Sequence, residues 1–157
     1  MVYKLTVISD VHYDVNRLRR IMPIINSSDY LVFCGDGLFN LLTVRGEILV
    51  PTICVRGNCD REPNVMNVAD LAGVTLGNTR VLVTHGHKQD VKHGISGLLA
   101  AAQAKRSSLV FFGHTHSFYD GSVGGIHFIN PGALCAGSYA LVLGDGANFT
   151  CKQEFVL

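Results

Sequence analysis

The segment from Leu109 to His116 delivers two histidines at the end of an apolar run. Residues 109–112 are Leu-Val-Phe-Phe, typical of a strand buried on both faces, and Gly113 turns the backbone before His114 and His116. In an extended backbone, side chains two residues apart point to the same side, so one strand end can offer two imidazoles to a metal site. An isolated motif of this kind is more often a pair of surface histidines. The metal interpretation therefore depends on whether similar residues end other strands.

Metal-binding residue types end four more apolar segments of the chain. The full set of candidate ligands is Asp10, His12, Asp36, Asn58, His85, His114 and His116. Two carboxylates, four imidazoles and one amide are too many for one ion and suit a pair. Two divalent ions bridged by a carboxylate can hold both the attacking and the leaving oxygen of a phosphoryl group. The set predicts a dinuclear site in which a metal-activated hydroxide attacks a phosphate ester without a covalent enzyme intermediate.

The first half of the chain predicts alternating strands and helices. The expected elements are strands at residues 5–8, 30–34 and 52–56 and a helix at residues 38–43. Asp14 is expected to cap a further helix that reaches about Asn26, and Pro23 predicts a kink or an early stop in it. This order is typical of parallel βαβ units, whose sites form at the carboxyl ends of the strands.

The second half is expected to be more antiparallel. The expected elements are strands at residues 80–84, 109–112, 118–123, 126–129, 139–143 and 149–155 and a helix at residues 96–104. Residues 67–77 suggest two short strands with a turn at Gly73, and Ser96 is expected to cap the helix. Gly-rich turns such as Gly124-Gly125 and Gly144-Asp145-Gly146 are expected to join the last strands.

The composition limits the class of protein. The chain of 157 residues fits one domain, which we take to span residues 1–157. A net charge of +1 without a basic stripe argues against nucleic-acid binding, and no apolar run is long enough for a membrane span. Five cysteines without a C-x-x-C pair, and no signal-peptide pattern, favour reduced thiols and a cytoplasmic location. The high apolar content predicts that some surface is buried in a homo-oligomer.

Five short motifs together carry a family resemblance. They are Asp10-x-His12, Gly35-Asp36, Gly57-Asn58-x-Asp60, His85-Gly86-His87 and Gly113-His114-Thr115-His116. In this order, and each after a predicted strand, they resemble the signature of the calcineurin-like metallophosphoesterases. Because no insertions interrupt it, the chain is similar to the small bacterial and archaeal phosphodiesterases, which are related to the retromer subunit of the same fold. The resemblance spans about residues 5 to 133.

The resemblance implies a fold and a division of the ligands. The implied fold is a four-layer α/β/β/α sandwich in which two mixed sheets are flanked by helices. The implied ligands are Asp10, His12 and His116 for the first ion, Asn58, His85 and His114 for the second, and Asp36 as the bridge. The expected cofactor is a pair of divalent manganese ions, although the same ligands also accept iron, zinc or nickel.

The chain departs from larger relatives at two positions. Cys59 stands where they carry a histidine thought to protonate the leaving group, and Ala133 stands where they often have serine. A thiol of ordinary pKa is a poor general acid at neutral pH, which favours esters with acidic leaving groups or protonation of the leaving group by water. His87 is the other candidate proton donor, or it contacts a substrate oxygen, and Asp60 is a candidate hydrogen-bond partner of a ligand imidazole. Residues 130–132, Asn-Pro-Gly, are most simply a tight turn.

These observations predict a metal-dependent phosphoesterase acting on a small phosphate ester, and they favour a phosphodiesterase. The predicted catalytic residues are Asp36, Asn58 and His87. Three alternatives remain open: a phosphomonoesterase or nucleotidase, a non-catalytic protein-binding scaffold of the same fold, and a structural site with a single zinc ion. The intact ligand set argues against the scaffold, because a scaffold has no need of clustered imidazoles.

Overall fold

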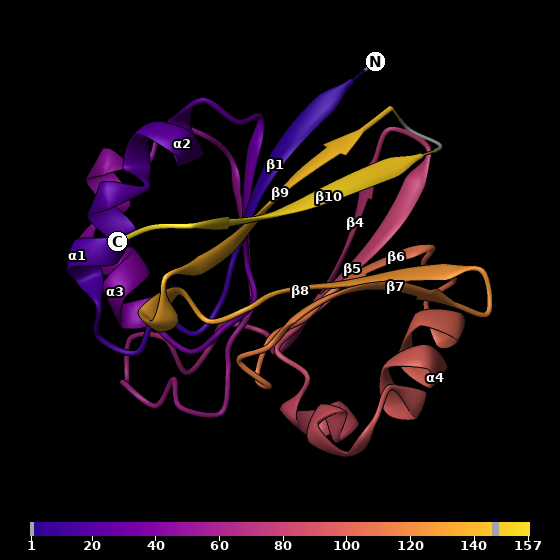
Figure 1. Cartoon of the computed structure of the whole chain (residues 1–157). Coiled ribbons are helices and arrows are strands. Elements are labelled where there is room, and N and C mark those ends of the chain that lie inside the picture. Colours follow the sequence, from indigo (N-terminus) through magenta and orange to yellow (C-terminus); the bar gives the residue numbers. More distant parts are fainter. Residues whose placement is uncertain (1, 146–147) are drawn as a thin grey trace.

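A computed structural model describes residues 2–145 and 148–157, which form two five-stranded sheets (Figure 1). The first sheet consists of β1 (Tyr3–Ile8), β2 (Tyr30–Phe33), β3 (Thr52–Cys54), β9 (Ser138–Gly144) and β10 (Phe149–Phe155). The second sheet consists of β4 (Leu71–Leu76), β5 (Thr79–Thr84), β6 (Leu109–Phe111), β7 (Phe118–Val123) and β8 (Ile126–Pro131). The strand order is β10-β9-β1-β2-β3 in the first sheet and β4-β5-β6-β8-β7 in the second.

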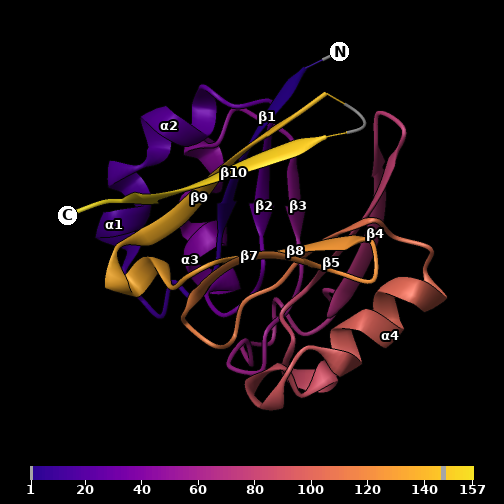
Figure 2. The same cartoon turned by 45° about the vertical axis from the view of Figure 1, so that its right-hand side comes forward.

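Helices cover the outer face of each sheet. They are α1 (Val15–Arg20), α2 (Met22–Asn26), α3 (Leu38–Thr43) and α4 (Ser96–Ala104), with the short 3₁₀ helices η1 (Arg45–Glu47), η2 (His87–Gln89), η3 (Val91–His93) and η4 (Leu134–Ala136). The first three α-helices pack on the first sheet and α4 packs on the second (Figures 1 and 2). The predicted four-layer α/β/β/α sandwich is confirmed. Within the described ranges, no helix is both long and apolar enough to cross a membrane.

Apolar side chains fill three layers between these elements. Leu5 and Val7 of β1 share the layer between the sheets with Val83 of β5 and Phe111 of β6. Neighbouring residues of the same strands point outwards to the helices, as the alternation of a strand requires. Because both faces of the central strands are buried, their sequences are continuous apolar runs.

Parallel pairing holds the middle of both sheets. β1, β2 and β3 are parallel to one another, and so are β5, β6 and β8. Antiparallel strands flank these parallel centres: β9 pairs with β1 and β10 with β9, β4 pairs with β5, and β7 pairs with β8. The expectation of a more antiparallel second half is confirmed. The first-half pairs β1–β2 and β2–β3 are parallel, whereas the second half has the antiparallel pairs β4–β5, β7–β8 and β9–β10 beside the parallel pairs β5–β6 and β6–β8.

The predicted interruption of the first helix is confirmed. Asp14 caps α1 by accepting a hydrogen bond from the backbone N–H of Arg17 at 3.1 Å. The helix ends at Arg20, and Pro23 lies in the first turn of α2, where its missing N–H leaves no intrahelical hydrogen bond unmade.

Two local predictions differ from the structure. Ser96 is the first helical residue of α4 and does not cap it. A single strand, β4, runs through Gly73, so the predicted turn there is wrong. The chain turns instead at Gly77, whose φ of 59° suits glycine. The turn predicted at Gly124-Gly125 is present between β7 and β8, whereas Gly146 of the other predicted turn lies outside the described residues.

Candidate metal centre

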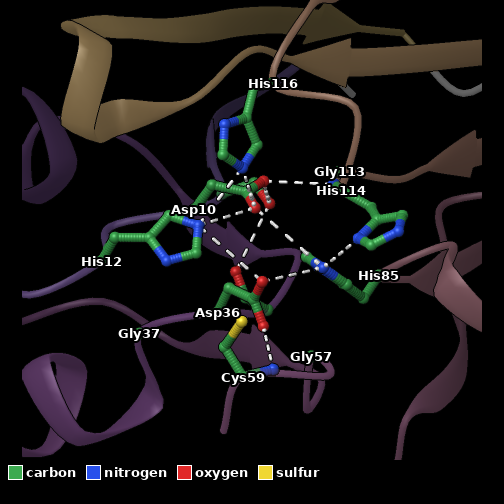
Figure 3. A network of polar contacts seen from close by, with 12 residues as sticks. Asp10, His12, Asp36, Gly37, Gly57, Cys59, His85, Gly113, His114 and His116 are labelled. Atoms are coloured by element: carbon green, nitrogen blue, oxygen red, sulfur yellow. Dashed lines mark hydrogen bonds and ion pairs between the residues drawn. The ribbon is translucent and has the colours of Figure 1, made fainter. Parts of the chain in front are cut away.

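Six of the seven candidate ligands meet at one edge of the sandwich, where strands of both sheets end (Figure 3). Asn58, the seventh, is the neighbour of Cys59, whose backbone N–H donates to Asp36. Asp10 and His12 follow β1, Asp36 follows β2, Asn58 follows β3, His85 follows β5, and His114 and His116 follow β6. The carboxylates and imidazoles labelled in Figure 3 point toward one another from these loops. The parallel centres of the sheets explain the convergence, because parallel strands present their carboxyl ends at the same edge.

Most of these ligands lie on sharply turned backbone. The φ angles are 55° for Asp10, 44° for His12, 62° for Asp36, 71° for His114 and 63° for His116. A left-handed conformation costs a non-glycine residue roughly 1–2 kcal/mol, so contacts with neighbouring loops must stabilise it. At Asp10, the backbone N–H donates to the carbonyl of Gly35 at 2.9 Å. The assumption of an extended backbone between His114 and His116 was wrong, and the turned backbone sends the two rings to different groups.

Asp10, His12 and His116 form the first group, with ligand atoms within 4.8 Å of one another. Oδ1 of Asp10 lies 3.3 Å from Nε2 of His12 and 3.1 Å from Nε2 of His116. The two Nε2 atoms are 3.2 Å apart. Oδ2 of the buried Asp10 accepts hydrogen bonds from the hydroxyl of Ser9 at 2.6 Å and the backbone N–H of His114 at 3.1 Å. These bonds fix the carboxylate so that Oδ1 faces the two rings.

Asp36, His85 and His114 form the second group, again with ligand atoms within 4.8 Å of one another. Nε2 of His85 lies 3.1 Å from Oδ2 of Asp36 and 3.2 Å from Nδ1 of His114. The Nδ1–H of His85 donates to the backbone carbonyl of Cys34 at 2.7 Å. This bond leaves Nε2 as the nitrogen that faces the group.

Asp36 lies between the two groups. Its Oδ2 is 3.1 Å from Nε2 of His85 and 3.8 Å from Nε2 of His12. Its Oδ1 accepts the backbone N–H of Cys59 at 2.8 Å. One carboxylate therefore reaches ring nitrogens of both groups.

The contacts within the groups suit bound cations. When His85 is neutral and donates through Nδ1, it directs a nitrogen lone pair at an oxygen of Asp36, which is repulsive unless a proton or a cation lies between them. Two ligands about 2.1 Å from a common ion are roughly 3.0–3.4 Å apart in octahedral or tetrahedral geometry. The separations of 3.1 to 3.3 Å within each group fall in this range.

Two predicted site residues carry polar atoms without hydrogen-bond partners. Oδ1 of Asn58 and Nδ1 of His87 are buried and have no partner among the described residues. The ring centroid of His87 lies 5.5 Å from that of His85 and 6.2 Å from that of His114, beside the second group. A buried oxygen without a partner is unfavourable, so Oδ1 of Asn58 suits coordination to a cation.

The charges of the site favour the cation-binding states of Asp36 and His114, whereas His85 holds a proton that a bound cation would displace. Burial raises the pKa of Asp36, but the hydrogen bond and positive charge of His85, with the backbone N–H of Cys59, outweigh it and lower the pKa to about 2. Burial and the positive charge of His85 lower the pKa of His114 to about 4. The pKa of His85 is raised, because its carboxylate neighbours outweigh the effect of burial. At pH 7, Asp36 is therefore an anion and His114 is neutral.

Asp60 supports the ligand loops through their backbone. Its carboxylate accepts hydrogen bonds from the N–H groups of Asp36, Gly37, Leu38 and Gly57 at 2.8 to 3.0 Å. The structure gives it no hydrogen bond to a ring nitrogen within the described part of the chain, so the expectation that Asp60 orients an imidazole was wrong. The carbonyl of Cys34 has that role for His85.

Asn130 is a supporting residue that the sequence analysis missed. Its buried side chain donates to the carbonyl of Gly113 and to Oγ1 of Thr115, both at 3.0 Å, and accepts the N–H of Gly132 at 2.9 Å. It thereby holds the loop that carries two candidate ligands. The available signal was a polar residue at the end of an apolar strand, the same signal that identified the ligands.

The glycines before the ligands are required by close contacts. A Cβ on Gly57 would lie 2.1 Å from Oδ1 of Asp36, and a Cβ on Gly113 would lie 2.0 Å from Oγ of Ser9. No larger residue fits without moving these side chains.

Cys59 lies at the exposed rim of the site. Its Sγ is within 4.8 Å of ligand atoms of His12 and Asp36. Burial and the carboxylate of Asp36 raise the pKa of the thiol. The thiol is therefore protonated at neutral pH and is a weak acid, in agreement with the sequence analysis.

The two-sheet sandwich with metal ligands at its strand ends defines a class of protein. The model of the calcineurin-like phosphoesterase superfamily domain matches residues 3–146 of the chain. The chain belongs to this superfamily, which is metal-dependent, and the family resemblance noted in the sequence is confirmed.

Two bacterial proteins of known sequence are similar to the chain. Probable metallophosphoesterase YsnB of Bacillus subtilis (strain 168) is 31% identical over 106 residues, which cover 68% of this chain and 59% of YsnB. Phosphodiesterase YfcE of Escherichia coli (strain K12) is 30% identical over 152 residues, which cover 83% of this chain and 79% of YfcE. The match thus spans less than two thirds of the length of YsnB.

Two solved structures share the fold. A conserved uncharacterized protein of Streptococcus pneumoniae TIGR4, described as a predicted phosphoesterase, has a TM-score of 0.82 at 23% identity, covering 99% of this chain and 90% of that one. Vps29 of Entamoeba histolytica, complexed with Zn²⁺, has a TM-score of 0.73 at 19% identity, covering 97% and 98%. At this identity the likeness establishes the architecture alone.

Proposed function

We propose that the chain is a metal-dependent phosphodiesterase that hydrolyses small phosphate esters at a dinuclear centre. The observation that carries the proposal is the position of Asp36, whose Oδ2 lies 3.1 Å from His85 and 3.8 Å from His12, one ring in each group. A carboxylate shared by two ligand groups is the arrangement that holds two ions close enough for phosphoryl chemistry. Similarity to proteins named metallophosphoesterase and phosphodiesterase supports the reaction class.

The proposed ligands follow the two groups. They are Asp10, His12 and His116 for one ion, Asn58, His85 and His114 for the other, and Asp36 for both. Manganese is the proposed metal, and iron, zinc and nickel suit the same nitrogen and oxygen donors. Bound ions would neutralise phosphate charge and lower the pKa of a water so that hydroxide is available near neutral pH.

The protein holds its ligands in place before substrate arrives. The carbonyl of Cys34 fixes the ring of His85, and Ser9 with the backbone of His114 fixes the carboxylate of Asp10. Such supporting hydrogen bonds set the tautomer and orientation of each ligand. Charge that develops on the phosphoryl oxygens therefore meets groups that need little rearrangement.

His87 is proposed to contact the substrate. Burial and the positive charge of His85 lower the pKa of His87, so the ring is neutral at pH 7. Its half-buried ring lies with its centroid 5.5 Å from that of His85, beside the second group, where a bound phosphate ester can contact it. A neutral imidazole and the protonated thiol of Cys59 are both weak acids, so the best substrates have leaving groups that are stable as anions.

Metal analysis combined with two chromogenic substrates tests this function. We expect two ions per chain after loading with manganese, and faster hydrolysis of bis(p-nitrophenyl) phosphate than of p-nitrophenyl phosphate. A chelator should abolish the activity and added manganese should restore it. Faster monoester hydrolysis would instead support a phosphomonoesterase or nucleotidase. Loaded protein that hydrolyses neither ester would support a scaffold, and one inert zinc ion per chain would support a structural site.

Three sequence-based expectations are kept as proposals. The chain is one domain over residues 1–157, it acts in the cytoplasm, and it forms a homo-oligomer. The cysteines are free thiols in the structure, which suits a reducing compartment. Light scattering of the purified protein tests the oligomer.

A further inference from the structure

An apolar pocket of about 330 Å³ lies on the outer side of the second sheet, beyond the end of β6. Its lining includes Val91, Ile95, Phe112, Thr115, Phe118 and Tyr119. Pockets that bind small organic groups typically measure about 300–1,000 Å³ and have mostly apolar walls with a few polar atoms. The size and lining of this pocket fit that description.

Both histidine loops of the metal centre contribute to the wall of this pocket. Thr115, in the wall, is bonded on either side to His114 and His116. Val91, also in the wall, donates its backbone N–H to the carbonyl of Gly86 at 3.2 Å. A Cβ on Gly86 would lie 2.8 Å from Cγ1 of Val91, so the packing there is tight. The pocket therefore adjoins the loops that present the second ligand group.

The walls of the pocket include aromatic rings. Phe112 and Tyr119 line it with ring centroids 6.1 Å apart and planes inclined by 57°. Tyr119 is 38% exposed, and a Cβ on Gly94 would meet no atom within 4 Å, so the pocket is open to an incoming group. Aromatic walls bind other aromatic rings through apolar contact and edge-to-face packing.

The opposite flank of the centre is different. The hollow lined by His12, Asp36, Cys59 and Phe39 has a volume of only about 20 Å³. A ring does not fit in that volume. The two flanks of the centre therefore offer unequal sites to the two ester groups of a phosphodiester.

We propose that the apolar pocket is a subsite for the non-leaving ester group of a phosphodiester, and that it binds an aryl or similarly flat apolar group. This inference rests on the proposed phosphodiesterase function and adds a substrate class to it. The leaving group then points away from the pocket: a hydroxide forms the new O–P bond opposite the leaving oxygen, the ester P–O bond breaks, and the alcohol leaves as its anion.

Two esters with the same leaving group test the subsite. p-Nitrophenyl phenyl phosphate and p-nitrophenyl methyl phosphate both release p-nitrophenolate, so they differ chiefly in the group offered to the pocket. With manganese-loaded protein we expect KM to be about tenfold lower for the phenyl ester than for the methyl ester, which is the effect expected when one aromatic ring is partly buried. The kcat values of the two esters should differ less than their KM values. Equal KM values for the two esters would overturn the proposal.

Variants on either flank locate the effect. Ile95→Ser and Tyr119→Ser should raise KM for the phenyl ester toward that of the methyl ester, while leaving the methyl ester nearly unchanged. Ile95 is the residue before α4, a position that serine favours, so this variant is expected to fold. Phe39→Ser is the matched control, because it removes a half-exposed aromatic ring from the other flank. A larger effect of Phe39→Ser than of Tyr119→Ser would overturn the assignment.

A binding measurement separates this inference from the proposed function. Phenylphosphonate has a C–P bond that the enzyme cannot hydrolyse, and saturation-transfer NMR reports whether its ring contacts the protein. We expect transfer to the ring protons that Tyr119→Ser and Ile95→Ser weaken. Hydrolysis of both diesters without such transfer would overturn the subsite and leave the phosphodiesterase. Transfer without any diester hydrolysis would overturn the phosphodiesterase, and the substrate assignment with it.

Discussion

The backbone N–H of His114 donates a hydrogen bond to Oδ2 of Asp10, 3.1 Å away and 104 residues earlier in the chain. The other oxygen of the same carboxylate lies 3.1 Å from Nε2 of His116. One buried side chain thus positions the loop that carries two candidate ligands and contributes to the first group itself. The candidate metal centre therefore also ties the end of β1 in the first sheet to the loop after β6 in the second.

Asp36→Asn should abolish metal-dependent turnover and leave the fold intact. The amide oxygen can still accept the backbone N–H of Cys59, but a neutral side chain cannot hold two cations as the shared anion does. We expect diester hydrolysis to fall by more than the roughly 10–100-fold typical when an outer-shell partner of a metal ligand is lost. Rates with bis(p-nitrophenyl) phosphate and circular dichroism of the same sample give the two readouts.

Asp90→Asn is the matched control for that variant. Asp90 is exposed and has a left-handed φ of 53°, close to the 62° of Asp36, but its carboxylate pairs only with His93 in the structure described. It should keep wild-type activity. Unchanged hydrolysis by Asp36→Asn would remove the bridging assignment.

Asp60→Asn should destabilise the protein. Four backbone N–H groups donate to this carboxylate, in three buried hydrogen bonds and one partly buried one, and an amide would present an N–H₂ group to some of them. Unsatisfied buried donors cost roughly 1–3 kcal/mol each, so we expect the free energy of unfolding to fall by about 3 kcal/mol. Urea unfolding in the presence of a chelator measures it without a contribution from bound metal.

The control for Asp60 is Asp29→Asn. Asp29 is an exposed carboxylate that accepts the backbone N–H of Lys4 at 2.7 Å. We expect a loss of less than about 1 kcal/mol there, because water can replace the bond. Similar losses for the two variants would contradict the supporting role of Asp60.

Asn130→Asp should weaken metal binding through the position of the histidine loop. The new carboxylate cannot donate to the carbonyl of Gly113 or to Oγ1 of Thr115, and it repels the former. We expect the metal Kd to rise about 10–100-fold, measured by competition with a fluorescent chelator. Asn26→Asp is the control. The side chain of Asn26 also donates to a backbone carbonyl and accepts a hydrogen bond from a backbone N–H, but both bonds lie at the surface. Equal affinities for the Asn130 variant and the wild type would contradict this role.

The metal-free protein should lose stability as the pH falls from 6.5 to 4. The pKa of His114 is about 4 in the folded protein against 6.5 when unfolded, so the unfolded chain binds the proton first in this window. The pKa of His85 is raised, so its contribution to stability is lost as the pH rises above 6.5. That change lies outside the window from pH 6.5 to 4 and does not mask the effect of His114. His114→Gln should flatten the dependence, which urea unfolding at pH 7 and pH 5 with a chelator measures.

The exposed His93 supplies the control for the pH experiment. Its side chain is 80% exposed and lies outside both ligand groups, so His93→Gln tests whether the loss of any one imidazole alters the pH dependence. If His114→Gln and the wild type lost the same stability between pH 7 and pH 5, the shifted pKa of His114 would be contradicted. Added manganese should also bind more weakly at pH 5, because protons compete for the imidazoles.

Local sequence was sufficient for most elements and for the candidate ligands. The run at residues 109–112 identified β6 because a strand buried on both faces is continuously apolar. The ligand types stood out because polar residues directly after such runs have no role in the apolar layers. Asp14 marked the start of the first helical segment because its side chain caps the helix, and Pro23 marked the break because proline has no N–H to donate. Both effects act within a few residues of the chain.

The partners of those residues could not be predicted in this way. The sequence placed Asp60 near the site, but only the fold shows that it collects backbone N–H groups from two loops. It likewise gave no sign that β9 and β10 would return to pair beside β1, or that Asn130 would brace the loop at Gly113. These contacts join segments far apart in the chain, and their energies depend on where the strands meet.

The amino-acid sequence by itself determined which side chains are available to bind metal and which strand ends carry them, because residue type and hydrophobic pattern are local properties. The tertiary structure decided that Asp36 lies between two groups, that His114 and His116 turn to different ones, and that an apolar pocket adjoins their loop. Those outcomes follow from sheet packing and left-handed backbone held by distant hydrogen bonds, which no short stretch of sequence encodes.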